Sequence, residues 1–118
     1  MRIVCLAIES TAHTFGASVV EFDNNDYKIL SNVRDMYKTE KGGIIPVELS
    51  EHHVNCFDKV IEESLTKAGK TLNQINLIAF SQGPGIGHAL RIGATVARSI
   101  SIRTGIPFNR CKIIALHI

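Results

Sequence analysis

Hydroxyl, carboxylate and imidazole groups are crowded into one short polar segment near the start of the chain, Glu9–Thr14 (ESTAHT). In a turn between strands, hydroxyl and backbone N–H groups of Ser10, Thr11 and Thr14 can bind phosphate oxygens. Glu9, at the end of the preceding apolar run, could hold a water molecule or a magnesium ion. Ser and Thr are also frequent turn residues for purely local reasons. The segment therefore predicts either a phosphate-binding turn or an ordinary structural one.

A second candidate segment is the glycine-rich stretch Gly83–Gly87 (GPGIG), which lies between an apolar run and a helical pattern. Backbone N–H groups and the helix dipole favour an anion at such a place. The dinucleotide-binding and Walker fingerprints both fail, because His88-Ala89-Leu90 stands where they require glycine or Gly-Lys-Ser/Thr. We expect either an anion-binding turn of no standard type or a tight packing turn.

The histidines give no metal-site pattern of their own. His52 and His53 are adjacent, about 100° apart on a helix, so they do not form the i, i+4 pair of H-E-x-x-H sites. His13 and His88 are isolated in the sequence. We predict surface or hydrogen-bonded structural roles for all four, with no metal ligand and no catalytic residue assigned. No G-x-S-x-G elbow is present, so a serine hydrolase has no support.

The apolar periodicity predicts the elements that position these segments. Three strands open the chain, joined by turns and followed by a glycine break, a helix that starts at Pro46 and ends at Gly69, a strand and a second helix. The predicted ranges are strands 2–8, 15–22 and 27–37, helix 46–68, strand 76–81, helix 88–104 and a last strand beginning near Ile113. An opening antiparallel meander followed by α/β crossovers indicates an α/β fold with a mixed sheet. In the first helix, we expect the stripe at Val54, Phe57, Ile61, Leu65 and Ala68 to pack on the sheet.

Composition limits the class of protein. The chain has 118 residues, of which 45% are hydrophobic and 20% charged, as in a single domain with a core. Cys5, Cys56 and Cys111 show no disulfide or zinc-ribbon spacing and are expected to be reduced. The apolar run at residues 3–8 is too short for a signal-peptide core or a membrane span, so we expect a cytoplasmic location without membrane contact.

Charge is distributed unevenly. All eleven acidic residues lie between Glu9 and Glu63, whereas seven basic and no acidic residues follow. This asymmetry is compatible with contact to phosphate or nucleic acid, and equally with a solvated helix face.

Three segments together resemble one family. IESTAHT (8–14), TEKGGIIPVELSEHH (39–53) and IAFSQGPGIGHALRIG (78–93) are similar, in order and spacing, to the opening third of the archaeal and eukaryotic tRNA threonylcarbamoyladenosine synthesis protein. This is the catalytic subunit of the KEOPS complex, also known as the O-sialoglycoprotein endopeptidase or glycoprotease family. The resemblance extends from Met1 to about Pro107.

The resemblance implies a ribonuclease-H-like lobe of the actin-like ATPase (ASKHA) fold over 1–106. It implies transfer of a threonylcarbamoyl group from threonylcarbamoyl-adenylate to a tRNA adenosine, with ATP and an iron or zinc ion bound between two lobes. It also implies KEOPS-like subunits and tRNA as partners. The nucleotide- or substrate-binding candidates are Glu9, Ser10, Thr11, His13, Thr14, Lys41, Gly42, Gly43, Glu48, His52, His53, Gly83, Pro84, Gly85 and Gly87.

The end of the chain departs from the family. The family's metal ligands in this half come from a His-Cys-x-Ala-His stretch, whereas this chain reads FNRCKIIALHI, and His117 alone cannot replace that stretch. The segment 113–118 can be encoded as ATC ATT GCA TTG CAC ATA, which read from its third base gives His-Cys-Ile-Ala-His. We hypothesise that 107–118 is a divergent tail whose last ten or so residues are out of frame.

The sequence therefore predicts the function of one part of an enzyme. The leading interpretation is the N-terminal part of a tRNA N6-adenosine threonylcarbamoyltransferase that is inactive alone, because it lacks the metal ligands and the facing lobe. The alternative is a non-catalytic binding or assembly module of a KEOPS-like complex. A small actin-like kinase fragment or a peptidase ranks last. An exposed lobe interface also predicts self-association.

Overall fold

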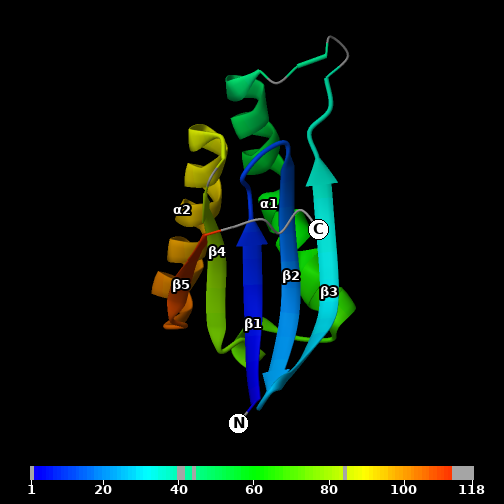
Figure 1. The fold of residues 1–118 in the computed structure, drawn as a ribbon, viewed down its shortest axis with the longest axis vertical. Helices are drawn as coiled ribbons and strands as arrows, with labels where there is room; N and C mark the ends of the chain where they lie inside the picture. The colour runs from blue at the N-terminus through cyan, green and yellow to red at the C-terminus, as the bar shows by residue number, and fades with distance from the viewer. Residues whose placement is uncertain (1, 40–41, 44, 84, 113–118) are drawn as a thin grey trace.

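The computed structural model describes residues 2–39, 42–43, 45–83 and 85–112. The chain forms one mixed sheet with two helices (Figure 1). The elements are β1 (Arg2–Glu9), β2 (Thr14–Asp23), β3 (Asp26–Met36), α1 (Pro46–Ala68), a short 3-10 helix η1 (Leu72–Gln74), β4 (Leu77–Gly83), α2 (Gly87–Thr104) and β5 (Phe108–Lys112). The predicted site residues Lys41 and Pro84, and the segment 113–118, lie outside the described residues.

The sheet has the strand order β3-β2-β1-β4-β5. β1, β2 and β3 form an antiparallel meander, whereas β4 pairs in parallel with β1 and β5 in parallel with β4. The meander turns at Asn24, whose φ of 57° is the left-handed conformation that Asn tolerates better than most residues. The predicted mixed sheet, with a meander followed by crossovers, is confirmed.

The two helices supply the crossovers and cover the sheet. α1 packs against β2 and β3, α2 packs against β4, and the helices contact each other. In Figure 1, α1 passes behind the strands and α2 lies beside it. Both helices end at glycines in the left-handed conformation, Gly69 (φ 68°) and Gly105 (φ 76°), as the sequence predicts. Leu6, Ile8 and Phe15 are among the fully buried core side chains.

One expectation about the elements is wrong, and another holds in part. The last strand begins at Phe108 and not near Ile113. Of the stripe expected to pack on the sheet, Ile61 is buried and Phe57, Leu65 and Ala68 pack against the core, whereas Val54 is 50% exposed. His53 and Ser64 are also buried on α1, because both find hydrogen-bond partners on the sheet side. No helix within the described residues is both long and apolar enough to cross a membrane.

Candidate functional site

The polar turn after β1 and the glycine-rich loop before α2 meet at one edge of the sheet. β1 and β4 are parallel neighbours, so their carboxyl ends, where Glu9 and Gly83 lie, point the same way. The N–H of Ile86 donates to the carbonyl oxygen of Thr11 at 2.7 Å. In open α/β sheets, ligands bind outside the carboxyl ends of the strands. The two segments singled out from the sequence thus form one continuous surface.

Glycine at position 85 is required by the closeness of this contact. A Cβ atom built on Gly85 would lie 2.3 Å from the carbonyl oxygen of Thr11 and 2.9 Å from its Cα. Both are backbone atoms, so the chain would have to move. Gly83 has a φ of 145°, which is another conformation that side chains disfavour, whereas a Cβ on Gly87 would meet nothing within 4 Å.

Ser10 joins the turn to α2 from inside. Its hydroxyl donates to the carbonyl oxygen of Ala89 at 2.8 Å and accepts from the N–H of Gly93 at 3.2 Å. Its own N–H donates to the Ser81 hydroxyl at 3.3 Å, and the residue is fully buried. The Ser10 hydroxyl therefore holds the turn on the helix, and does not face outward as expected for a phosphate-binding group.

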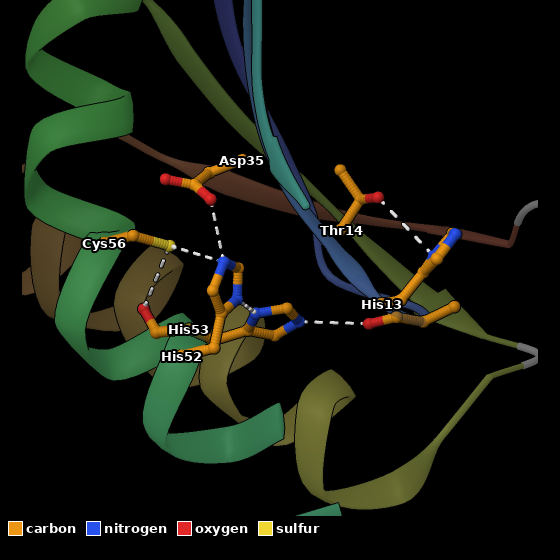
Figure 2. A network of polar contacts seen from close by, with 7 residues as sticks. His13, Thr14, Asp35, His52, His53 and Cys56 are labelled. Carbon is orange, nitrogen blue, oxygen red and sulfur yellow. Dashed lines mark hydrogen bonds and ion pairs between the residues drawn. The ribbon is translucent and has the colours of Figure 1, made fainter. Parts of the chain in front are cut away.

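Glu9 closes the same turn. Its Oε1 accepts a hydrogen bond from the N–H of Thr11 at 2.8 Å and another from the Thr11 hydroxyl. His13 is exposed, and its Nδ1 lies 3.5 Å from the Thr14 hydroxyl. The carboxylate thus orders the backbone of the turn, and Figure 2 shows the contact between His13 and Thr14 that follows it.

The remaining predicted residues follow β3 and begin α1. Gly42 and Gly43 are exposed with φ of 65° and 78°. Glu48 accepts a hydrogen bond from the Tyr37 hydroxyl at 2.7 Å. This hydrogen bond and the negative charge of Glu48 raise the pKa of Tyr37 above its usual value. Because the N–H of Tyr37 donates to the carbonyl oxygen of His13 at 2.7 Å, this region is tied to the polar turn.

His52 and His53 form a polar network with β3 and the turn (Figure 2). Nε2 of His53 lies 3.1 Å from the carbonyl oxygen of Ala12, and the two Nδ1 atoms lie 2.8 Å apart. Nε2 of His52 lies 2.9 Å from Oδ1 of Asp35. Both histidines are hydrogen-bonded within the fold, as the sequence predicts.

The hydrogen-bond acceptors around the two histidines determine which ring nitrogens carry a proton. A carbonyl oxygen only accepts, so Nε2 of His53 carries the proton and its Nδ1 accepts from His52. Burial lowers the pKa of His53, which keeps this ring neutral. Nδ1 of His52 faces His53, and its Nε2 faces the Asp35 carboxylate. The arrangement links α1 to β3 and to the polar turn.

Cys56 is a member of this cluster that the sequence analysis did not single out. Its Sγ lies 3.9 Å from Nε2 of His52, and burial raises the pKa of the thiol to about 11. The sequence signal was available: His52 and Cys56 are four residues apart, which places them on one face of a helix. This spacing is less conspicuous in the sequence than the adjacent His52-His53 pair.

Comparison with known proteins decides the family. A family model described as tRNA N6-adenosine threonylcarbamoyltransferase matches residues 28–118. The chain belongs to this family. It is 48% identical over 98 residues to the tRNA N6-adenosine threonylcarbamoyltransferase of Sulfurisphaera tokodaii, covering 83% of this chain and 29% of that protein. The enzyme of the same name from Thermococcus gammatolerans is 44% identical over 112 residues, covering 92% and 33% respectively.

The chain spans about a third of the length of these relatives, so the family resemblance concerns their N-terminal region. Among solved structures, YeaZ from Pseudomonas aeruginosa matches with a TM-score of 0.71 at 16% sequence identity, covering 96% of this chain and 45% of that one. This similarity confirms the predicted fold class, a single α/β lobe whose mixed sheet combines an antiparallel meander with crossovers.

The iron or zinc site that the resemblance implies does not fit the described residues. Its ligands in this half belong to a His-Cys-x-Ala-His stretch, and residues 2–39, 42–43, 45–83 and 85–112 contain none.

Proposed function

We propose that this chain is the N-terminal part of a tRNA N6-adenosine threonylcarbamoyltransferase, and that it supplies one wall of the site where threonylcarbamoyl-adenylate is bound. The observation that carries the proposal is the direct contact of the polar turn with the glycine-rich loop at the carboxyl ends of β1 and β4. The family membership supplies the reaction.

A basic hollow beside the loop supports an anionic ligand. Arg91 and Arg98 line, with Ser81 and Gln82, a hollow of about 220 Å³ next to the start of α2. Neither arginine forms an ion pair within the described residues. Unpaired guanidinium groups bind phosphate well, so this hollow suits the phosphate of an adenylate or of tRNA.

Within this proposal, each residue group has a physical task. Backbone N–H groups around Gly85 and Gly87 lie at the N-terminal end of α2, where the helix dipole favours negative charge. Glu9 and Ser10 fix the shape of the turn from within, and His13 and Thr14 offer side chains at its open side. Positioning of this kind lowers a barrier only when the facing lobe completes the site, so the chain alone is inactive. The cytoplasm remains the expected location.

A chimera tests the proposal. Residues 1–106 of this chain replace the matching segment of the Sulfurisphaera tokodaii relative, and the product is incubated with tRNA and threonylcarbamoyl-adenylate. We expect threonylcarbamoyladenosine in the tRNA from the chimera and none from the 118-residue chain alone. A chimera that unfolds cooperatively, and is therefore folded, but leaves the tRNA unmodified contradicts the proposal.

A non-catalytic assembly module is the second candidate, because one surface of the two helices is apolar and open. Val54, Phe57, Ile92 and Ile100 line a groove of about 470 Å³ between α1 and α2, with Arg91 and Arg103 at its sides. Capture of a KEOPS-like subunit by this chain, together with an inactive chimera, would favour this candidate. Association of the chain with itself would appear as a concentration-dependent mass in sedimentation.

A further inference from the structure

The cluster of His52, His53 and Cys56 is the one group of histidine, cysteine and acidic side chains within the described residues that is gathered closely enough to hold a metal ion. One ligand atom from each side chain lies within 4.8 Å of the others. All three residues are on the N-terminal half of α1, at positions that share one helix face. The cluster touches the polar turn of the proposed adenylate wall only through the Ala12 carbonyl oxygen, to which His53 is hydrogen-bonded.

One ring nitrogen of each imidazole already has the kind of hydrogen-bond partner that orients histidines in metal sites. Metal-ligating histidines donate their second ring N–H to a carbonyl oxygen or a carboxylate, which fixes the ring and its tautomer. His53 has the carbonyl oxygen of Ala12 at 3.1 Å from its Nε2, and His52 has Asp35 Oδ1 at 2.9 Å from its Nε2. Both Nδ1 atoms are thereby turned toward each other, 2.8 Å apart (Figure 2).

We propose that the Nδ1 atoms of His52 and His53 and the Sγ of Cys56 form a binding site for a divalent metal ion of zinc type, with Asp35 and the Ala12 carbonyl orienting the two rings. Two nitrogens and one thiolate are the donor set that zinc accepts, and a water molecule completes four ligands. The metal takes the place of the proton between the two imidazoles. That proton and the thiol proton of Cys56 are released to solvent, so that charge and atoms balance.

The two imidazole nitrogens need only a small movement to reach coordination spacing, and the Sγ of Cys56, within 4.8 Å of a ligand atom of each ring, has to move toward them. Two nitrogens bound at about 2.0 Å in a tetrahedral site lie roughly 3.3 Å apart, so the rings need to separate by about half an ångström. His53 is fully buried, and its ring packs edge-on against Phe15 at 5.6 Å between centroids. The side chain of His52 is 17% exposed and that of Asp35 is 47% exposed. The side of the cluster with His52 and Asp35 is therefore the less buried one.

This site is separate from the metal of the family resemblance. Its ligands are on α1, whereas the His-Cys-x-Ala-His stretch would follow α2. The inference does not rest on the proposed function, and its test requires no transfer activity.

The test is a titration of the metal-free 118-residue chain with Co²⁺ and then Zn²⁺, followed by absorption spectroscopy. We expect a thiolate-to-cobalt charge-transfer band in the near ultraviolet, which Zn²⁺ abolishes. Cys56→Ser should remove this band, and Asp35→Asn should weaken Zn²⁺ binding by about 10- to 100-fold. His88→Ala, at an exposed histidine on α2, is the matched control and should bind like the parent chain.

Three results would overturn the proposal. One is the lack of any charge-transfer band in the folded parent chain. Another is a band that persists in Cys56→Ser, which would assign the thiolate to another cysteine. The third is Zn²⁺ affinity that is unchanged in Asp35→Asn and Cys56→Ser. Far-ultraviolet circular dichroism of each variant verifies that the helices are intact, so loss of binding is not loss of fold.

Discussion

The carbonyl oxygen of Thr11 accepts a hydrogen bond from the N–H of Ile86 at 2.7 Å, although 75 positions separate the two residues in the sequence. This bond joins the turn after β1 to the loop before α2. Neither segment matches a standard phosphate-binding fingerprint, yet the parallel pairing of β1 with β4 makes them neighbours. The proposed adenylate wall, made of this turn and this loop, exists because β1 and β4 are paired.

Substitution of Gly85 tests how closely the two segments must approach. Gly85→Ala places a Cβ 2.3 Å from the backbone of Thr11, so the loop has to move and the Ile86–Thr11 hydrogen bond is strained. We expect a loss of about 1–3 kcal/mol in the free energy of unfolding, measured in urea. Gly87→Ala is the control, since its Cβ meets nothing within 4 Å. Equal stability of both variants would refute the close approach.

Ser10 and Gly93 should be energetically coupled. Ser10→Ala removes a buried partner of the Ala89 carbonyl and the Gly93 N–H, at a cost of about 1–3 kcal/mol. Gly93→Ala places a Cβ 2.3 Å from the Ser10 hydroxyl oxygen. In the double variant that oxygen is gone, so the double variant should be more stable than the sum of the single losses predicts, by about 1–3 kcal/mol. Additive losses in a urea-unfolding cycle would contradict the geometry.

Tyr37 should ionise at higher pH than an unperturbed tyrosine. Its hydroxyl donates to Glu48, which stabilises the neutral form and raises the pKa. The stability that this group contributes is present below its usual pKa and is lost as pH rises through the raised one. Ultraviolet titration should show that Glu48→Gln lowers the pKa of Tyr37. An unchanged titration curve would mean that the Tyr37–Glu48 bond does not persist in solution.

A buried pair of hydroxyls fastens α1 to β3. The Ser31 and Ser64 hydroxyl oxygens lie 2.9 Å apart, and Ser31 also accepts from the N–H of Val19 beside a β-bulge. Ser64→Ala removes the hydrogen-bond partner of the Ser31 hydroxyl on α1, so we expect a loss of about 1–3 kcal/mol in the free energy of unfolding. Ser99→Ala, at an exposed serine on α2, should change it by less than about 0.5 kcal/mol. A loss of similar size in both variants would argue against the buried pair.

The sequence predicts the elements well wherever local signals are strong. Pro46 and Gly69 bound α1, and Gly105 ends α2, because backbone conformation at these residues is set locally. The sequence predicts the start of β5 about five residues after its observed start, because FNRCK has no alternating apolar pattern. The pairing of this edge strand with β4 is a long-range property that the local pattern does not encode.

The candidate site was predictable as a set of segments but not as a set of contacts. Hydropathy assigns His53 and Ser64 to the surface of α1, whereas the structure buries both against partners on the other elements, Ala12 and Ser31. Such partners are far away in the sequence and leave no periodic signal. For the same reason the inward direction of the Ser10 hydroxyl was not foreseen.

The most direct test of the account compares transfer rates in the chimera that carries residues 1–106. The chimera with Gly85→Ala and the chimera with Ser99→Ala, at an exposed serine of α2 outside the proposed binding surface, are each assayed for threonylcarbamoyladenosine in tRNA. If the turn and the loop together form the adenylate wall, Gly85→Ala should reduce the rate by about 100-fold, because a displacement of about 1 Å misplaces the reacting groups, and Ser99→Ala should leave it nearly unchanged. Equal rates in the two folded variants would contradict the central claim.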